Sequence, residues 1–303
     1  MRVVIALGGN ALLRPRERPE IDVQRRNLAG AARAIAPLAR DHALVLTHGN
    51  GPQIGWLALQ AEAAAAASAG GRVPLDVLGA ESEALIGCLL ERELAPLLPG
   101  RSMATLLTQV EVDPGDPAFR LPTKPIGPIY DGAHARALAA ERGWAIAPAQ
   151  EGFRRVVPSP EPVRIRECSA ILQLVQAGVL VICAGGGGVP VVATAAGDLR
   201  GVEAVIDKDL TSALLARELD ADALLLLTDV EGVLEGWPAP SARLIRRIRF
   251  DELRRLGLPP GSMGPKAEAA ARFVEWTSRH AAIGRLEDAA RVLHGEAGTS
   301  VVP

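Results

Sequence analysis

Short apolar runs alternate along this chain with longer segments of helical periodicity, and three of the apolar runs lead directly into glycine clusters. They are 2–7 before Gly8-Gly9-Asn10, 43–47 before His48-Gly49-Asn50-Gly51, and 179–183 before Gly185-Gly186-Gly187-Gly188. This alternation is typical of a mostly parallel sheet flanked by helices. The carboxyl ends of parallel strands share one edge, where ligands bind in such folds, so we expect the three clusters to lie together.

The same patterns predict the remaining elements of an α/β core. Helices are predicted at about 22–38, 53–67, 80–95, 168–177, 208–219, 265–277 and 286–293, and further strands at about 103–107, 223–227, 280–283 and 299–302. Apolar residues make up 49% of the 303 residues, which is enough for a sizeable core in one large domain or two smaller ones.

The segment 113–165 interrupts this alternation of strands and helices. It holds nine of the 23 prolines and the only tyrosine of the chain, Tyr130. Proline removes backbone donors and favours turns, so we expect a loop-rich insertion with short strands that forms a flap beside the core.

Charge and composition exclude several classes of partner. The formal net charge is −2 and aromatic residues make up only 3% of the chain, so neither nucleic acid nor a membrane surface is an expected partner. No apolar run approaches the ~18 residues of a membrane span, and the N-terminal run is too short for a secretion signal.

The cysteines and histidines show no metal-binding pattern. Cys88, Cys168 and Cys183 are far apart and lie in apolar segments, which predicts buried free thiols in a reducing cytoplasm. The five histidines have no ligand spacing, so no bound structural metal is expected.

Lysine is rare in this chain: of 33 basic residues, only Lys124, Lys208 and Lys266 are lysines. A lysine ammonium is a compact charge that fits against a single phosphate oxygen, whereas arginine presents a wide planar fork. Because all three lie in segments marked by Gly, Pro or Asp, we interpret them as functional. Arg154-Arg155 is a further candidate anion contact, and a solvated surface pair is the equally open alternative.

Glycine clusters at strand ends let backbone N–H groups approach an anion, and a following helix adds its positive end. Three such clusters together with Lys208 and Lys266 therefore indicate a phosphate-handling site. The chain lacks a Walker A loop, and Ile54 breaks the dinucleotide fingerprint after Gly49. A hydride-transferring enzyme is disfavoured.

The triplet Asp207-Lys208-Asp209 stands at the start of a predicted helix. One aspartate is enough to cap the helix, and the other is free to orient Lys208 and Lys266. Phosphoryl transfer needs positioning and charge neutralisation of the migrating group rather than a covalent partner. Two lysines held by one aspartate meet that need.

Eight segments resemble, in order, those of the carbamate kinases of the amino acid kinase superfamily, and the match runs from residue 3 to about 300. They are Val4–Leu12, Thr47–Gln53, Pro122–Pro128, Arg154–Pro160, Gly185–Pro190, Gly201–Asp209, Leu227–Val230 and Gly261–Lys266.

The resemblance implies an αβα three-layer sandwich about a mainly parallel sheet, with a small protruding subdomain at about 113–165. It implies acid binding by residues 1–200 and nucleotide binding by residues 201–303, within one two-lobed unit. It further implies reversible phosphoryl transfer between ATP and carbamate, with Mg²⁺ carried by the nucleotide, in a cytoplasmic homodimer. Leu85, Ile86, Leu89 and Leu90 form an apolar stripe that is compatible with a dimer interface or with the chain's own core.

The same resemblance implies roles for individual residues. Lys208 and Lys266 would contact the ATP phosphates and the migrating group, Asp209 would organise them, and Lys124 would reach the carbamoyl end from the subdomain. The residues implied to bind the small acid are Gly8, Gly9, Asn10, Gly49, Asn50, Gly51, Gly186 and Gly187. Those implied to lie near the nucleotide, besides the two lysines, are Thr228, Asp229, Met263 and Gly264.

The helix around Glu83 departs from the pattern, because Glu83-Ala84 stand where carbamate kinases usually have Gln-Gly. Carboxylates of Glu81 and Glu83 would repel an anionic substrate if they pointed toward it. Two other functions stay open: a kinase of the same fold acting on another small acid or phosphate, and a nucleotide sensor without turnover. The intact lysines with Asp209 disfavour the sensor.

Overall fold

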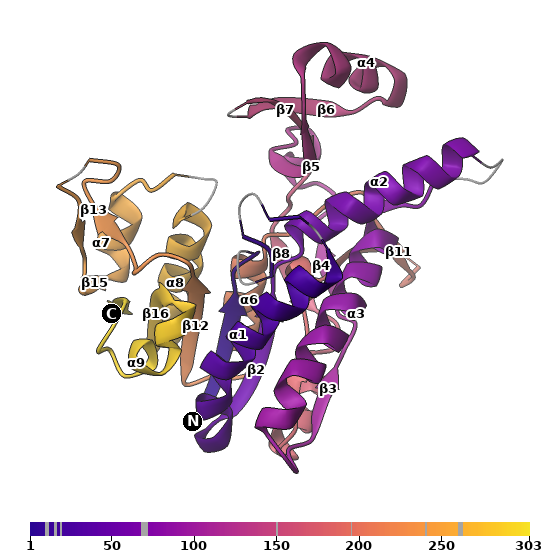
Figure 1. The fold of residues 1–303 in the computed structure, drawn as a ribbon. Helices are drawn as coiled ribbons and strands as arrows, with labels where there is room; N and C mark the ends of the chain where they lie inside the picture. Colours follow the sequence, from indigo (N-terminus) through magenta and orange to yellow (C-terminus); the bar gives the residue numbers. More distant parts are fainter. Residues whose placement is uncertain are drawn as a thin grey trace.

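The computed structural model describes residues 1–9, 12–14, 17–18, 20–67, 72–149, 151–194, 196–239, 241–259 and 263–303. Its centre is a sheet of eight strands (Figure 1). In spatial order these are β15 (Arg247–Arg249), β17 (Thr299–Val302), β16 (His280–Arg285), β12 (Ala223–Thr228), β1 (Arg2–Leu7), β2 (Ala43–His48), β9 (Leu180–Ile182) and β3 (Met103–Thr105). All neighbours are parallel except β16 and β17, which are antiparallel.

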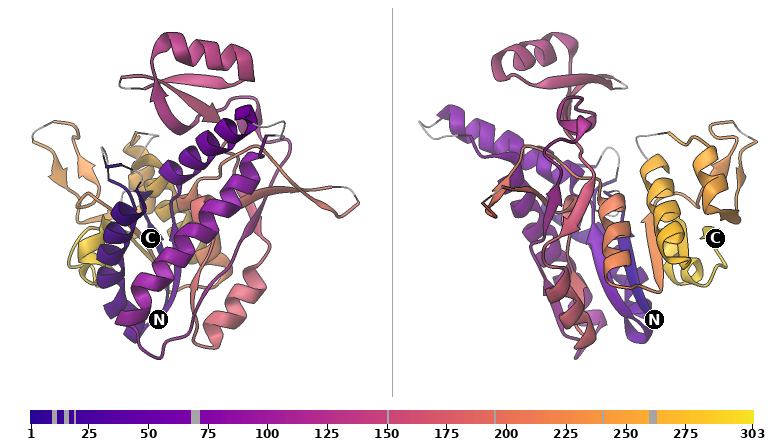
Figure 2. Two further views of the ribbon diagram at one scale, coloured as in Figure 1. Left: turned by 45° about the vertical axis from the view of Figure 1, so that its right-hand side comes forward. Right: turned by 180° about the vertical axis from the view of Figure 1, so that it is seen from behind.

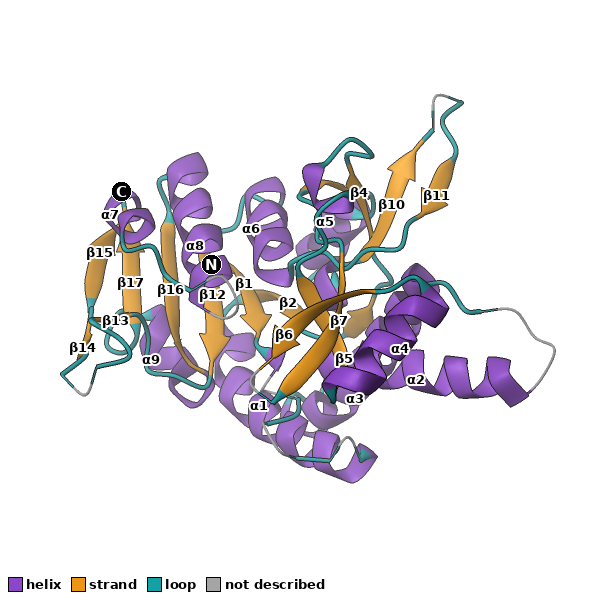
Figure 3. Cartoon of the chain, turned by 90° about the horizontal axis from the view of Figure 1, so that it is seen from above, coloured by secondary structure: helices purple, strands orange, loops and turns teal. Residues whose placement is uncertain are grey.

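Alternate residues of the central strands point to opposite faces, and each face is covered by helices, as Figure 3 shows from above. Val4 and Ala6 pack with α5 (Cys168–Gln176), α6 (Lys208–Glu218) and α8 (Met263–Thr277). Val3, Ile5 and Leu7 pack with α1 (Ile21–Asp41), α3 (Leu75–Leu94) and α9 (Ala289–Leu293). The predicted three-layer α/β sandwich with a mainly parallel sheet is thereby confirmed.

A second, smaller sheet continues the core beside β3. Its order is β11 (Leu199–Gly201), β10 (Val189–Ala193), β4 (Gln109–Val112) and β8 (Pro162–Ile165). The sequence patterns did not predict this sheet, since its strands are short and three of them lie next to proline or glycine. β8 belongs to this sheet although it falls inside the predicted insertion 113–165.

The protruding subdomain stands above the core in both views of Figure 2. It consists of an antiparallel sheet in the order β5 (Lys124–Tyr130), β7 (Gly152–Val157) and β6 (Ala145–Ala149), covered by α4 (Gly132–Arg142). Its short strands were expected, whereas α4 was not. Asp131 caps this helix, and Gly143 ends it with φ of 67°.

The subdomain leans on α2 (Gly51–Ala67) at a point of close backbone contact. A Cβ added to Gly55 would lie 2.5 Å from the Cα of Gly127 in β5. Any side chain at position 55 would push the two elements apart, so glycine is needed where α2 meets β5.

The remaining elements are the hairpin β13 (Leu234–Glu235) and β14 (Arg243–Leu244), the helix α7 (Phe250–Arg255), and 3₁₀ turns at Ala95–Leu97, Pro117–Phe119, Gly185–Gly187 and Leu286–Asp288. α3 begins at Leu75, five residues before the predicted start at 80. None of the helices in the described ranges is long and apolar enough to cross a membrane.

The expectation of buried cysteines was wrong for Cys88 and holds only in part for the half-buried Cys168, while the structure favours one of the two alternatives for the apolar stripe. Cys88 is exposed rather than buried, although all three cysteines are free thiols. Ile86, Leu89 and Leu90 are buried in the chain's own core, and only Leu85 of that stripe is exposed. The stripe therefore gives no support for a dimer interface.

Candidate functional site

Asp209 joins two lysines that are 58 residues apart in the chain. Its Oδ1 accepts a hydrogen bond from Lys208 Nζ at 2.5 Å, and its Oδ2 accepts one from Lys266 Nζ at 3.0 Å. Asp209 and Lys208 lie in the first turn of α6, and Lys266 lies in the first turn of α8. The structure thus brings together the three residues that the sequence proposed as a phosphate-handling group.

This cluster is buried and carries a net positive charge. Burial opposes ionisation of Asp209, but the ammonium groups of Lys208 and Lys266 hold its pKa well below the ordinary value. Burial and the neighbouring Lys266 lower the pKa of Lys208, while Asp209 outweighs burial and raises the pKa of Lys266. With all three ionised, two positive charges face one negative charge, and the excess favours an incoming anion.

Lys124, in β5 of the protruding subdomain, contacts the segment Asp207-Lys208-Asp209. Its Nζ donates to Asp207 Oδ2 at 2.6 Å. The other oxygen of Asp207 caps α6 by accepting the N–H of Asp209 at 2.9 Å. Asp207 therefore both begins the helix and holds the subdomain's lysine, and the sequence patterns predicted only the first of these two roles.

The three glycine clusters that follow β1, β2 and β9 also lie close together, as the sequence predicted. A Cβ added to Gly49 would lie 3.1 Å from Gly9 N and 3.4 Å from Lys208 Cε. A Cβ added to Gly186 would lie 2.1 Å from Asn50 Nδ2. The strand ends of β1, β2 and β9 thus carry their glycine clusters to one place beside Lys208.

The backbone of the third cluster requires glycine. Gly186 and Gly187 have φ of 69° and 100°, a region that other residues rarely adopt. Thr211 of α6 ties this turn to the lysine cluster by donating its hydroxyl to Gly187 O at 2.9 Å. Gly8 directly follows β1 and Gly51 begins α2, three residues after β2 ends, whereas Asn10 lies outside the described residues.

A cavity of about 320 Å³ opens beside Lys266 at the end of β12. The predicted nucleotide residues Thr228, Asp229 and Met263 line it, together with Gly8 and Gly9. Gly264 does not: it packs against the chain before α8 and donates its N–H to Pro259 O at 2.9 Å.

The sequence analysis did not predict five apolar residues of this cavity: Val230, Leu234, Trp237, Leu258 and Pro259. Trp237 is 61% exposed, which is unusual for so large an apolar side chain. Its signal in the sequence was the segment Gly236-Trp237-Pro238 in a chain with only four tryptophans.

Glu83 lies directly beneath the glycine turn. It is fully buried, and its oxygens accept the N–H groups of Gly185 at 2.9 Å and Thr108 at 3.3 Å. Burial raises its pKa to about 8, so at neutral pH the group is mostly a neutral acid. The repulsion that a carboxylate would cause is thus reduced by protonation, and Glu81 is exposed.

His48 is the neighbour of Glu83 across Gly185. A Cβ added to Gly185 would lie 2.5 Å from His48 Nε2 and 2.9 Å from Glu83 Cγ. Burial lowers the pKa of His48 to about 4, and its Nε2 meets no hydrogen-bond partner among the described residues. His48 is therefore neutral at pH 7, and the pair adds no full charge beneath the glycine turn.

Arg154 and Arg155 lie outside this cluster. Arg154 donates from Nε and Nη2 to Gly127 O at 3.0 and 2.7 Å, which holds the turn in β5. Arg155 lies 3.5 Å from Glu203 on the other side of the subdomain's base.

Comparison with known proteins agrees with this geometry. The profile of the amino acid kinase family matches residues 1–283. The chain is 51% identical over 304 residues to the carbamate kinase of Rhizobium meliloti, covering 99% of this chain and 93% of the relative. It is 48% identical to that of Haemophilus influenzae, covering 99% and 96%.

Among solved structures, the carbamate kinase of Giardia lamblia bound to AMP-PNP superposes with a TM-score of 0.91 at 39% identity, covering 99% of this chain and 98% of that one. A protein of Aeropyrum pernix superposes with a TM-score of 0.93 at 43% identity, covering 100% and 99%. These relatives confirm the resemblance read from the eight sequence segments. The chain belongs to the amino acid kinase family.

Proposed function

We infer that this chain is a carbamate kinase, which transfers a phosphoryl group reversibly between ATP and carbamate to give ADP and carbamoyl phosphate. The observation that carries this inference is the convergence of Lys124, Lys208 and Lys266 on the neighbouring aspartates 207 and 209, in a chain about half identical to curated carbamate kinases.

Lys208 and Lys266 are proposed to contact the migrating phosphoryl group. Such a group carries charge on its three peripheral oxygens while the attacking and leaving oxygens stand in line. Two fixed ammonium groups neutralise that charge without having to reorganise, which is where electrostatic catalysis gains most. Asp209 keeps both lysines ionised and in place, and acts as a positioning residue.

Lys124 is proposed to contact the carbamoyl end from the protruding subdomain. It already lies at the same triplet through Asp207, so a small shift would exchange the aspartate for the substrate's oxygens. The N–H groups of the clusters at 8–10, 49–51 and 186–187 are proposed to hold the small acid. Carbamate is compact enough to be held in this way with few side-chain contacts.

The nucleotide is proposed to occupy the cavity beside Lys266. Gly8, Gly9 and Lys266 in its lining are suited to phosphates, while Met263 and Trp237 offer apolar surface for the base. The structure of the Giardia relative contains bound AMP-PNP, an ATP analogue. We propose the acid-binding part at residues 1–200 and the nucleotide-binding part at 201–303.

Mg²⁺ is proposed to enter with the nucleotide. The carboxylates of Asp207 and Asp209 are engaged by lysines, and the described residues contain no group of three metal-binding side chains. This donor set fits an ion that is held mainly by phosphate oxygens and that would neutralise part of their charge. We also propose a cytoplasmic homodimer, by analogy with the family.

A coupled assay of ATP formation from ADP and carbamoyl phosphate tests the proposal. Turnover with carbamoyl phosphate, and none with acetyl phosphate or other acyl phosphates, is the expected result. Turnover only with another phosphate donor would indicate a different kinase of this fold. ADP binding without any turnover would indicate a nucleotide sensor.

A further inference from the structure

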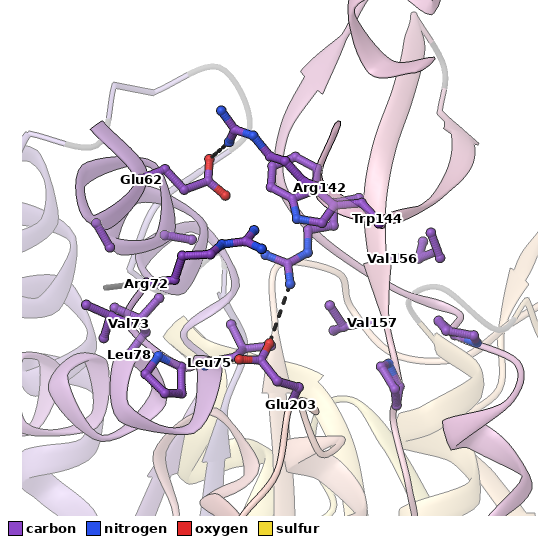
Figure 4. A pocket seen from close by; sticks show the side chains of 18 residues that line it. Glu62, Arg72, Val73, Leu75, Leu78, Arg142, Trp144, Val156, Val157 and Glu203 are labelled. Carbon is purple, nitrogen blue, oxygen red and sulfur yellow. Dashed lines mark hydrogen bonds and ion pairs between the residues drawn. The ribbon is translucent and has the colours of Figure 1, made fainter. Parts of the chain in front are cut away.

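A second cavity, of about 550 Å³, lies between α2, the start of α3 and the base of the protruding subdomain (Figure 4). Its lining includes none of the three lysines and none of the glycines in the clusters described above. It is therefore separate from the candidate active site.

Arginines dominate the charge of this cavity. Arg72, Arg142 and Arg155 line it, against the carboxylates of Glu62 and Glu203. Arg142 pairs closely with Glu62, and Arg155 lies 3.5 Å from Glu203, whereas Arg72 pairs with no carboxylate in the described ranges. Burial together with Arg72 lowers the pKa of Arg155, although Glu203 and Glu62 oppose this. The lining thus carries one unbalanced positive charge.

An aromatic ring holds two of these guanidinium groups in place. The central carbons of Arg142 and Arg155 lie 5.1 and 4.8 Å from the ring centroid of Trp144. In Figure 4 the Arg142 side chain reaches toward Glu62, and the Arg72 side chain points into the space between Glu62 and Glu203. Stacked guanidinium groups are preorganised for planar or tetrahedral oxyanions.

Glu203 occupies the position that such an anion would take. Its Oε1 accepts the N–H of Leu75, the first residue of α3, at 2.8 Å, and its Oε2 faces Arg155. α3 has Pro74 at its N-cap position and no side chain of its own to cap it. The Glu203 side chain is 58% exposed, so a solute can replace it without opening the core.

Glu203 is also linked to the candidate active site. It lies four residues before Asp207, and between them Val205 N donates to Pro158 O at 2.9 Å. Asp207 holds Lys124 of β5, and Glu203 holds Arg155 of the adjacent strand β7. The segment 203–207 therefore forms one ion pair with β5 and another with β7, the two adjacent strands of the subdomain.

We propose that this cavity is a second binding site for a small anion with at least two negative charges, of the phosphate or dicarboxylate class. The anion displaces Glu203 from Arg155 and from the start of α3, and so changes how firmly the 203–207 segment holds the subdomain. The site is independent of which acid the active site phosphorylates.

The test uses a chain in which Trp144 is the only tryptophan, made by W56F, W237F and W276F, and titrates it with inorganic phosphate and, separately, with succinate. At least one anion is expected to change the Trp144 emission saturably at concentrations below about 50 mM. Added R155Q or R72Q is expected to weaken binding by about tenfold or more, and E203Q to strengthen it several-fold. Added R40Q, remote from the cavity, serves as the matched control.

Added K208Q separates the two sites, because it impairs the active site and leaves the cavity intact. A response that survives K208Q and is lost in R155Q supports the proposal, with either anion. A response that is lost in K208Q and kept in R155Q places the anion in the active site and overturns it, as does the absence of any response.

Hydrogen exchange on the chain with its four tryptophans retained provides a second measurement if the triple variant does not fold. Inorganic phosphate or succinate should slow hydrogen exchange at residues 72–78 and 152–158. This slowing is expected in the parent and in K208Q but not in R155Q. Unchanged exchange at both segments would refute the second site even if the carbamoyl phosphate assay succeeds.

Discussion

Lys124 and Asp207 are 83 residues apart in the chain, yet Lys124 Nζ lies 2.6 Å from Asp207 Oδ2. This ion pair joins the protruding subdomain to the first turn of α6, where Lys208 and Asp209 follow. The position of the subdomain is therefore linked directly to the residue that caps α6.

Replacing Asp207 with Asn should separate its two roles. Asparagine still caps α6, so we expect the free energy of unfolding to fall by less than about 1 kcal/mol. Lys124 loses its charged partner, so the KM for carbamoyl phosphate should change several-fold while the KM for ADP changes little. Steady-state kinetics and urea unfolding measure the two effects. Asp207→Ala, which also removes the cap, is the control for stability, and equal shifts of both KM values would contradict this role.

Arginine at position 266 or 208 should keep the charge and lose the geometry. A guanidinium is wider than an ammonium and displaces the migrating group, and a misplacement of about 1 Å can cost on the order of 10²-fold in rate. We expect each variant to lose at least about two orders of magnitude in kcat with nearly normal folding. Lys124→Arg should impair acid affinity more than nucleotide affinity.

Arg40→Lys tests whether lysine and arginine are interchangeable elsewhere on this chain, and should leave kcat unchanged. Near-normal turnover of Lys266→Arg would mean that no single phosphate oxygen requires an ammonium at that position.

Glu83 should make stability depend on pH. Burial raises its folded-state pKa to about 8 from an ordinary value of 4.5, so the folded chain binds this proton more tightly than the unfolded chain. Its contribution is then fully present below pH 4.5 and is lost as pH rises through about 8. Glu83→Gln keeps one of the two accepting oxygens and has no ionisable proton, so it should flatten the decline in the free energy of unfolding between pH 5 and 9. Parallel pH profiles of parent and variant would show that Glu83 does not titrate in this range.

Trp237→Ala tests the apolar wall of the cavity beside Lys266. Loss of an aromatic face against a base costs about 1–3 kcal/mol in stacking. We therefore expect the Kd for ADP, measured by calorimetry, to rise by roughly fivefold or more while the KM for carbamoyl phosphate stays near normal. Trp276→Ala, which removes an indole outside this cavity, should leave the Kd for ADP unchanged.

The sequence by itself determined the alternation of strands and helices and the edge of the sheet where the glycine clusters meet. These features are local: apolar periodicity sets the element type, Asp207 caps the helix that follows it, and glycine favours the positive φ found at Gly186 and Gly187. The lysines were recognisable for a similar reason, because their rarity and their neighbours are visible in the chain itself.

Only the tertiary structure decided what depends on contacts between distant segments. Examples are the pairing of Lys124 with Asp207, the burial of Ile86 and Leu90, and the small sheet that includes β10. The sequence patterns did not predict α4, because prolines lie on either side of it and only Ala135 and Leu138 of this helix are buried. The proton on Glu83 is the clearest case: its pKa is set by burial beneath the Gly185 turn, and desolvation depends on the packed surroundings rather than on neighbours in the sequence.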